Sequence, residues 1–225
     1  MNMSMSNPIF YSFRRCPYAM RARLALNSSK LGVELREIIL RDKPEHMLEV
    51  SPKGTVPVMI LPQGQVIDES LDVMLFALGQ NDPEHLLNPD AANLDDMLSL
   101  IAQFDGPFKT ALDRYKYANR HENVDVDDER KIASEHLMEL EALLLKSEGY
   151  LFGDRISLAD LAIFPFVRQF ANVDKDWFND QPWPNLIKVL DNFVSSERFL
   201  SIMEKYPRWQ EGDQAIYFGS TGVEK

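Results

Sequence analysis

The sequence predicts two domains of different fold class, an α/β N-terminal domain and an all-α C-terminal domain. Three observations predict them. Strand and helix patterns alternate through residues 1–79, the periodicity stops in 80–93, and the pattern from 94 to 225 is helical throughout. The middle stretch holds two prolines and several Asn and Asp residues, which is typical of a linker. We therefore expect a first domain at 1–79, a linker at 80–93 and a second domain at 94–225.

The first domain begins with a strand, a helix and a second strand. Residues 8–13 are apolar, aromatic and β-branched, as expected of a short buried strand. A helix is predicted from Pro17 to Leu31, because Pro17 suits the first helical position and Gly32 ends the pattern. Residues 33–40 have the composition of a second strand. Two strands joined through one helix make a right-handed crossover between parallel strands.

The rest of this domain is a connector, a hairpin and a helix. A polar turn at 41–47 leads into a short helix. Two apolar segments, 55–61 and 65–68, flank Pro62-Gln63-Gly64, the pattern of an antiparallel hairpin. An apolar helix at 71–78 follows. The order βαβ, connector, ββα describes a thioredoxin-like domain with a mixed four-stranded sheet.

The second domain is predicted to consist of helices alone. Leu94–Tyr117 is one helical segment, which Gly106-Pro107 should bend or break. Ser157 and Asp160 have the spacing of a capping box, and the helix behind them is apolar nearly all round, which places it in the core. The other helices are expected at about 127–149, 158–170, 185–194 and 198–205.

Charge and cysteine content narrow the class of protein. The formal net charge is −11, which argues against a nucleic-acid or anionic-membrane partner, because both attract basic surfaces. Met1–Asn7 lacks the charged and apolar regions of a secretory signal, and no apolar run is long enough to cross a bilayer. A cytoplasmic protein is therefore expected. The single cysteine excludes an internal disulfide and a cysteine-based zinc site, and we expect no metal.

That cysteine, Cys16, lies at the junction of the first strand and the first helix. Because Pro17 starts the helix, Cys16 is the expected N-cap. A thiolate there accepts hydrogen bonds from the first-turn N–H groups and feels the positive end of the helix dipole, while Arg14 and Arg15 add positive charge. These features favour the thiolate, which is the nucleophilic form. The competing interpretation is a small buried hydrophobe, and a position beside arginines at a helix start argues against it.

Three other places are suited to the groups of a peptide-like ligand. Val56-Pro57 begins the third strand, and if its peptide bond is cis the Val56 backbone faces Cys16 and can pair with an extended peptide. The alternative is a trans proline at a strand edge. Glu69 and Ser70, at a helix start, can hold an amino and a carboxylate group, or they serve as helix caps alone. Lys43 offers a charge for a second carboxylate, or it is simply solvated.

Together these segments resemble the cytosolic glutathione transferases, most closely the omega class and its bacterial relatives, in which a cysteine stands at this position. Cys16-Pro17-Tyr18-Ala19 is similar to the omega active-site sequence, which commonly has phenylalanine where Tyr18 stands. Lys43-Pro44-Glu45, Val56-Pro57, Glu69-Ser70 and the capping box at 157–160 resemble other segments of the family. The resemblance implies that Cys16 is the catalytic residue. It also implies a glutathione-binding set of Tyr18, Lys43, Val56, Pro57, Glu69 and Ser70.

The activity that the resemblance implies is glutathione-dependent thiol transfer. The Cys16 thiolate would attack a glutathionyl mixed disulfide or a small oxidised molecule, and a second glutathione would release oxidised glutathione. Glutathione is then a co-substrate, dehydroascorbate and small disulfides are the implied acceptors, and a homodimer is the implied assembly. Two alternatives stay open. One is a transferase that conjugates glutathione to small electrophiles by ionising its thiol through Tyr11 or Ser12, and the other is a non-catalytic interaction module.

The helical domain is expected to form the pocket for the second substrate. Four aromatic side chains are candidates for its lining: Phe104, Phe108, Tyr115 and Trp177. Any single one of them is better explained by packing in a helical core.

Overall fold

The computed structural model describes residues 7–121, 123–147 and 149–219. The chain divides into two compact units, one formed by Met1–Glu84 with Glu197–Lys225 and the other by His85–Ser196. The opening residues, which we judged not to be a secretory signal, lie largely outside the described part. No helix within the described residues is long and apolar enough to cross a membrane.

The first unit is built on one mixed sheet. Its strands lie in the order β4-β3-β1-β2-β5, and their bounds are β1 Ile9–Ser12, β2 Val33–Glu37, β3 Val58–Ile60, β4 Val66–Ile67 and β5 Ile216–Phe218. β1 pairs in parallel with β2 and antiparallel with β3, so that Phe10 lies opposite Leu35 on one side and Met59 on the other. β3 pairs antiparallel with β4, with Met59 opposite Ile67. These pairings confirm the predicted parallel pair of strands and the predicted hairpin. The fifth strand was not predicted.

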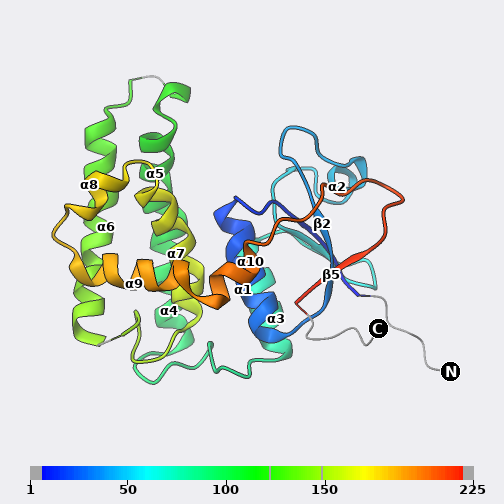
Figure 1. Ribbon diagram of the computed structural model, residues 1–225, viewed down its shortest axis with the longest axis horizontal. Coiled ribbons are helices and arrows are strands. Elements are labelled where there is room, and N and C mark those ends of the chain that lie inside the picture. Colours follow the sequence, from blue (N-terminus) through cyan, green and yellow to red (C-terminus); the bar gives the residue numbers. More distant parts are fainter. Residues whose placement is uncertain (1–6, 122, 148, 220–225) are drawn as a thin grey trace. The chain divides into compact units, whose positions relative to one another are not determined.

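Helices cover both faces of this sheet (Figure 1). The unit holds α1 (Pro17–Ser29), α2 (Glu45–Val50), α3 (Ser70–Gln80) and α10 (Glu197–Ile202). Successive residues of a strand point to opposite faces. On β1, the Tyr11 hydroxyl bonds His46 of α2, whereas the Ser12 hydroxyl accepts a bond from Arg23 of α1. The two helices therefore lie on opposite faces, and α3 packs beside α1 on the same side.

The C-terminal segment belongs to the first unit, and this corrects the prediction of one helical domain over 94–225. After α10 the chain runs on without regular structure and then pairs as β5 with β2, with Leu35 opposite Ile216. Figure 1 shows this segment, in orange and red, running along the sheet unit. A three-residue strand at residues 216–218 has too short a pattern to be recognised, and only its partner β2 makes it a strand.

Two other boundaries also differ from the prediction. α1 ends at Ser29, two residues before the expected end at Leu31, because Lys30 adopts a left-handed conformation with φ 56°. β2 ends at Glu37, because an isolated bridge between Ile39 and Asp42 turns the chain away from the sheet.

The second unit is helical, as predicted. Its elements are α4 Leu94–Gln103, the π-helical turn η1 Phe104–Phe108, α5 Lys109–Lys116, the 3₁₀ turn η2 Ala118–Arg120, α6 Val126–Ser147, α7 Leu158–Ala171, α8 Lys175–Asn179 and α9 Pro184–Ser195. The predicted disruption at Gly106-Pro107 takes the form of the π turn, which accommodates Pro107 inside a continuing helix. The capping box before α7 is also present, since Asp160 accepts bonds from the N–H and the hydroxyl of Ser157.

Candidate functional site

Cys16 occupies the position that the sequence predicted. It is the N-cap of α1, with an extended conformation of φ −80° and ψ 123°, and Pro17 follows at the first helical position. A reverse turn brings the chain from β1 to this point, because the Cys16 N–H donates to the carbonyl of Phe13 over 2.9 Å. The Cys16 carbonyl accepts the first helical bond from Met20 at 2.9 Å. The thiol therefore stands at the N-terminal end of α1. Its side chain makes no cap hydrogen bond to the first turn, which lies wholly within the described residues, so the expected hydrogen bonds from the first-turn N–H groups are not formed in this structure.

The Cys16 side chain lies against the beginning of the β3 segment. Its Sγ is 3.8 Å from the carbonyl oxygen of Val56, and the Val56-Pro57 peptide bond is cis. Val56 is buried, and Cys16 is half-buried within the same apolar cluster. Two residues forty positions apart in the chain thus meet in one site. The cis bond settles the question that the sequence left open.

The start of α3 carries a second group of polar contacts. Ser70 is buried, and its hydroxyl accepts a hydrogen bond of 2.9 Å from Nε of Arg21 on α1. Glu69, the N-cap of α3, lies largely exposed and accepts a bond of 2.5 Å from Nζ of Lys53. The same ammonium group lies 3.4 Å from Asp68. An ammonium group therefore already sits at the carboxylate that was expected to receive the amino group of a ligand.

Asp68 is fixed by a further contact on the loop before β3. The hydroxyl of Ser51 donates to Oδ2 of Asp68 over 2.7 Å. This hydrogen bond, with the charge of Lys53, holds the pKa of Asp68 below its ordinary value. The carboxylate is consequently ionised at neutral pH and adds to the negative potential at the start of α3.

Tyr18 and Lys43 lie at the edges of these contacts. The guanidinium of Arg21 lies over the Tyr18 ring, 5.2 Å from its centroid, so the ring packs on the group that holds Ser70. The ammonium of Lys43 lies beside Gly54, which has φ +60°, and a Cβ there would stand 3.4 Å from Nζ. Gly54 thus provides both the turn and the space for this lysine.

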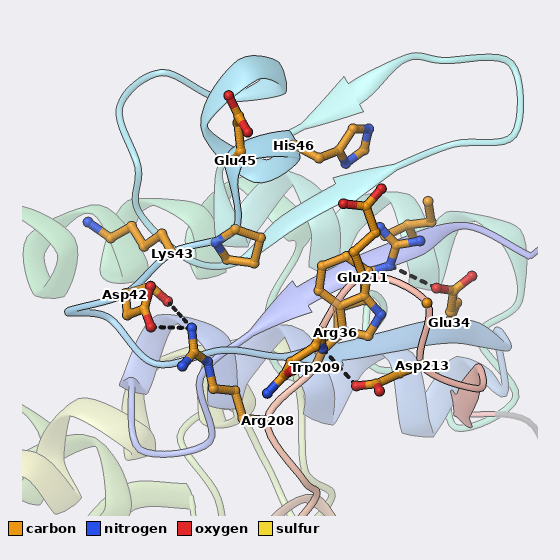
Figure 2. A pocket seen from close by; sticks show the side chains of 14 residues that line it. Glu34, Arg36, Asp42, Lys43, Glu45, His46, Arg208, Trp209, Glu211 and Asp213 are labelled. Atoms are coloured by element: carbon orange, nitrogen blue, oxygen red, sulfur yellow. Dashed lines mark hydrogen bonds and ion pairs between the residues drawn. The ribbon is translucent and has the colours of Figure 1, made fainter.

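A cavity of about 560 Å³ opens on the α2 side of the sheet (Figure 2). It lies between the residues around α2, including Lys43 and His46, and the C-terminal residues 208–213. Arg36 stacks on Trp209 at 4.3 Å and donates to the Tyr11 hydroxyl, while Arg208 pairs with Asp42. Cys16 is not among its lining residues. Figure 2 shows Lys43 pointing away from the other labelled side chains, so the lysine is at the border of this cavity.

Comparison with known proteins decides the family. Residues 10–85 match the family model described as "Glutathione S-transferase, N-terminal domain", and residues 111–211 match "Glutathione S-transferase, C-terminal domain". The chain belongs to the glutathione S-transferase family. The transferase is 26% identical to glutathione S-transferase omega-1 of Sus scrofa, over 88% of this chain and 76% of that protein. It is 30% identical to glutathione S-transferase DHAR2 of Arabidopsis thaliana, over 67% of this chain and 64% of that protein.

A solved structure extends the likeness across both units. It is a glutathione transferase family member from Pseudomonas fluorescens with two glutathione bound. The TM-score is 0.74, with 20% identity over 90% of the transferase and 94% of the other chain. At this identity the likeness concerns the fold.

The two hydroxyl groups considered for the conjugating alternative, those of Tyr11 and Ser12, both form hydrogen bonds within the protein. Tyr11 and Ser12 are fully buried. Ser12 Oγ accepts a bond of 2.8 Å from Arg23. The Tyr11 hydroxyl lies 2.9 Å from Nδ1 of His46 and accepts a bond of 2.8 Å from Arg36. Burial raises the pKa of Tyr11 despite the opposing effect of Arg36. Both hydroxyl groups are thus held by contacts within the fold.

The aromatic candidates for the second-substrate pocket mostly form the core of the helical unit. Phe104 and Phe108 are fully buried and stack with centroids 4.6 Å apart, and Tyr115 is 7% exposed beside Phe170. Trp177 is half-buried and lies under the guanidinium of Arg130 at 4.5 Å. Core packing therefore explains three of the four candidates.

Sequence reasoning missed the residues that support the site. Arg21 holds Ser70, Lys53 neutralises Glu69, and Arg23 with Glu37 lies behind the Cys16 turn. The only sign of them in the sequence is that arginines fall among the apolar positions of α1. This pattern does not identify the residues that those arginines contact. Within the described ranges no group of three His, Cys, Asp or Glu side chains is arranged to hold a metal ion.

Proposed function

We propose that this transferase is a glutathione-dependent thiol transferase with Cys16 as its nucleophile. The observation that carries the proposal is the approach of Sγ of Cys16 to 3.8 Å from the Val56 carbonyl. The chain has one thiol, and that thiol lies at a helix N-terminus, against backbone that an extended peptide can use. Similarity to an omega-1 transferase and to the DHAR2 transferase supports the same choice.

The polar groups around Cys16 suit the parts of glutathione. We propose that the Val56 N–H and carbonyl pair with the cysteinyl backbone of the tripeptide. Glu69 and Ser70 receive the γ-glutamyl amino and carboxylate groups at the start of α3. Lys43 pairs with the glycine carboxylate, and Tyr18 with Arg21 supports the γ-glutamyl end.

The reaction then proceeds as two thiol–disulfide exchanges. The Cys16 thiolate attacks the glutathionyl sulfur of a mixed disulfide, the old S–S bond breaks, and the departing thiolate takes a proton from water. The product is a Cys16–glutathione disulfide. The thiolate of a second glutathione attacks the glutathionyl sulfur, which releases oxidised glutathione and restores the Cys16 thiolate. A single cysteine suits this scheme, because glutathione supplies the second thiol. Reduction of dehydroascorbate also takes two electrons, which two glutathione molecules supply as they form oxidised glutathione.

The experiment compares wild type with Cys16→Ala in three assays with glutathione: reduction of hydroxyethyl disulfide, reduction of dehydroascorbate, and conjugation to a small electrophile. We expect the first two activities in wild type and their loss in Cys16→Ala, with weak conjugation in both. The cysteine mechanism would be refuted if wild type showed no thiol transfer and Cys16→Ala still conjugated glutathione. A hydroxyl group would then be the candidate for ionising the glutathione thiol.

The interaction-module alternative is tested by ligand binding. Millimolar glutathione should raise the melting temperature of wild type, because a ligand that binds only the folded state stabilises it. No rise, together with no activity in any assay, would favour a non-catalytic module. A cytoplasmic location and a homodimer remain part of this proposal, and light scattering of the purified chain measures the second.

A further inference from the structure

The turn that carries Cys16 is held by a largely buried carboxylate on the neighbouring strand. Within the Phe13–Cys16 turn, the N–H of Arg14 donates to Oε1 of Glu37 over 2.7 Å. Glu37 is the last residue of β2, and its side chain is 11% exposed. The acceptor is therefore fixed by the sheet and screened from water, which strengthens a hydrogen bond to a charged group.

The other oxygen of the same carboxylate pairs with Arg23 of α1. Arg23 is fully buried, and its guanidinium also donates hydrogen bonds to two further elements. Nε donates to Ser12 Oγ at 2.8 Å, and Nη1 donates to the carbonyl of Ile202 at 3.1 Å. One guanidinium thus joins β1, β2, α1 and α10. Because its ion pair is buried, neither partner can move without leaving a charge uncompensated.

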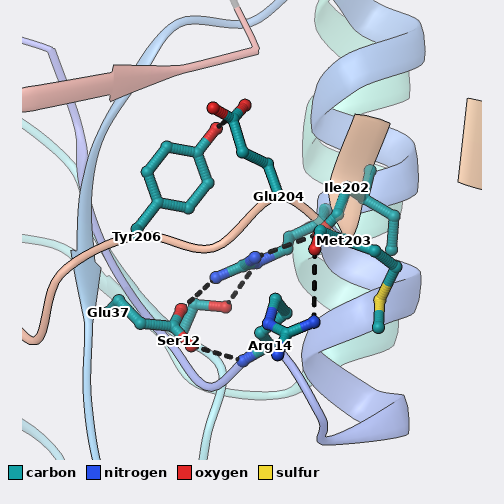
Figure 3. Close-up of polar contacts among 8 residues, drawn as sticks. Ser12, Arg14, Glu37, Ile202, Met203, Glu204 and Tyr206 are labelled. Carbon is teal, nitrogen blue, oxygen red and sulfur yellow. Dashed lines mark hydrogen bonds and ion pairs between the residues drawn. The ribbon is translucent and has the colours of Figure 1, made fainter. Parts of the chain in front are cut away.

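The C-terminal segment closes this arrangement (Figure 3). The guanidinium of Arg14 donates to the carbonyl of Met203 at 3.2 Å, and the backbone carbonyl of Glu37 accepts a bond of 2.8 Å from Trp209 N–H. Tyr206 lies 5.9 Å from Arg23, and burial, with a hydrogen bond to Glu204, raises its pKa to about 12. Tyr206 is therefore neutral at physiological pH, and the charge paired with the Glu37 carboxylate is that of Arg23.

We propose that Glu37 is a positioning residue for Cys16. Its carboxylate holds the Arg14 N–H, which fixes the turn and keeps the thiol at the N-terminal end of α1, against the Val56 carbonyl. The buried Arg23 and the C-terminal segment in turn hold Glu37. This goes beyond the proposed function, and it rests on that proposal only in taking Cys16 as the reactive group.

Two double variants isolate the hydrogen bond from the buried charge. Glu37→Gln with Arg23→Met keeps an acceptor oxygen for the Arg14 N–H, whereas Glu37→Met with Arg23→Met has the same size and lacks the acceptor. Neither leaves an unpaired buried charge, because replacing both partners of a buried ion pair by uncharged residues of similar volume is tolerated much better than replacing one. Glu34→Gln is the control, since Glu34 also lies on β2 but pairs with Arg36.

The readout is the pH profile of alkylation by iodoacetamide. With one cysteine in the chain, every event reports Cys16. We expect the Gln variant and the control to keep the wild-type rate at pH 7 within about twofold. The Met variant should shift the midpoint upward by about half a unit or more, which is roughly a threefold loss of rate at a pH one unit or more below the midpoint. Both double variants lose the same two charges, so any electrostatic effect on the midpoint is common to both, and the difference between them reports the lost acceptor for the Arg14 N–H.

Amide hydrogen exchange gives a second readout that does not depend on the thiol. The amide of Arg14 should exchange faster in the Met variant than in the Gln variant. Equal exchange and equal alkylation profiles in the two double variants would overturn the proposal, as would a loss of stability without any change in the profile. Because no glutathione is used, a chain without thiol-transfer activity can still show the Glu37 effect, and the two proposals fail independently.

Discussion

The capping box before α7 allows a quantitative prediction, because the same motif also occurs on the surface. Asp160 is fully buried, and its oxygens accept bonds from Leu151 N–H at 2.9 Å and from Ser157 N–H at 2.8 Å. The hydroxyl of Ser157 donates to it at 2.6 Å. Asp160→Ala leaves two backbone N–H groups without an acceptor. Each costs about 1–3 kcal/mol, so we expect a loss of about 2–6 kcal/mol in the free energy of unfolding.

The surface box before α4 is the control. There Oδ2 of Asp96 accepts a bond of 3.0 Å from the N–H of Asn93, and Oδ1 of Asn93 accepts one of 3.0 Å from the N–H of Asp96. Both side chains are exposed. Water replaces the lost acceptor in Asp96→Ala, so the expected loss is about 1 kcal/mol or less. The difference in unfolding free energy lost between Asp160→Ala and Asp96→Ala measures how much burial adds to the contribution of these hydrogen bonds.

The buried box should also respond to pH. Burial raises the pKa of Asp160 to about 6, although its hydrogen bonds oppose the shift. Since the pKa is higher in the folded than in the unfolded state, this group stabilises the fold at low pH, and the contribution is lost as pH rises through 6. Between pH 7 and pH 5 the wild type should gain about 1 kcal/mol from this residue, and Asp160→Ala should lack that gain.

Urea unfolding followed by far-UV circular dichroism at pH 5 and pH 7 measures both effects. We expect the stability difference between wild type and Asp160→Ala to be larger at pH 5 than at pH 7. A difference that is the same or smaller at pH 5 would refute the effect of burial on the carboxyl group. A loss in Asp160→Ala no greater than that in Asp96→Ala would refute the account of its hydrogen bonds.

Three further predictions concern the sheet unit. The alkylation rate of wild-type Cys16 should have its midpoint well below 8.5, the value of a free thiol, and a midpoint near 8.5 would count against an activated nucleophile. Glu69→Ala should weaken glutathione binding, measured by calorimetry, more than it lowers the melting temperature, whereas Lys53→Met, which removes the competing ammonium group, should strengthen binding about two- to fivefold; the reverse pattern would leave Glu69 only a structural partner of Lys53. Gly219→Ala should destabilise the pairing of β5 by about 1–3 kcal/mol, because Gly219 has φ +86° and a Cβ would collide with the carbonyl of Leu31; unchanged protection of the β5 amides in hydrogen exchange would contradict this.

Patterns local in the chain were readable from the sequence. The strand, turn and Pro17 around Cys16 predicted an N-cap cysteine, and the structure has one. Ser157 and Asp160 predicted a capping box, and its bonds are present. In both cases the residues that interact lie within a few positions of one another, so the spacing in the sequence is already the spacing in space.

Contacts between distant segments were not readable. The sequence placed residues 197–225 in the helical domain, but Arg23 and Arg14 bind the carbonyls of Ile202 and Met203, and β5 pairs with β2. A carbonyl oxygen belongs to every residue, so no residue type marks Ile202 or Met203 as an acceptor. Nothing in the local sequence distinguishes Arg23, Glu37 and Lys53 from ordinary surface residues. Charged residues of these types are usually found on the surface.

The sequence by itself determined the order of the elements from β1 to α3, the position of Cys16 and the resemblance to the family, because these follow from short-range periodicity, capping and motif spacing. Only the tertiary structure decided what surrounds the thiol: the Val56 carbonyl at 3.8 Å, the ammonium group of Lys53 on Glu69, and the buried Arg23–Glu37 pair behind the turn. The physical reason is that burial and pairing depend on which distant segments the folded chain brings together, and a charged residue carries no record in its local sequence of the partner it will meet.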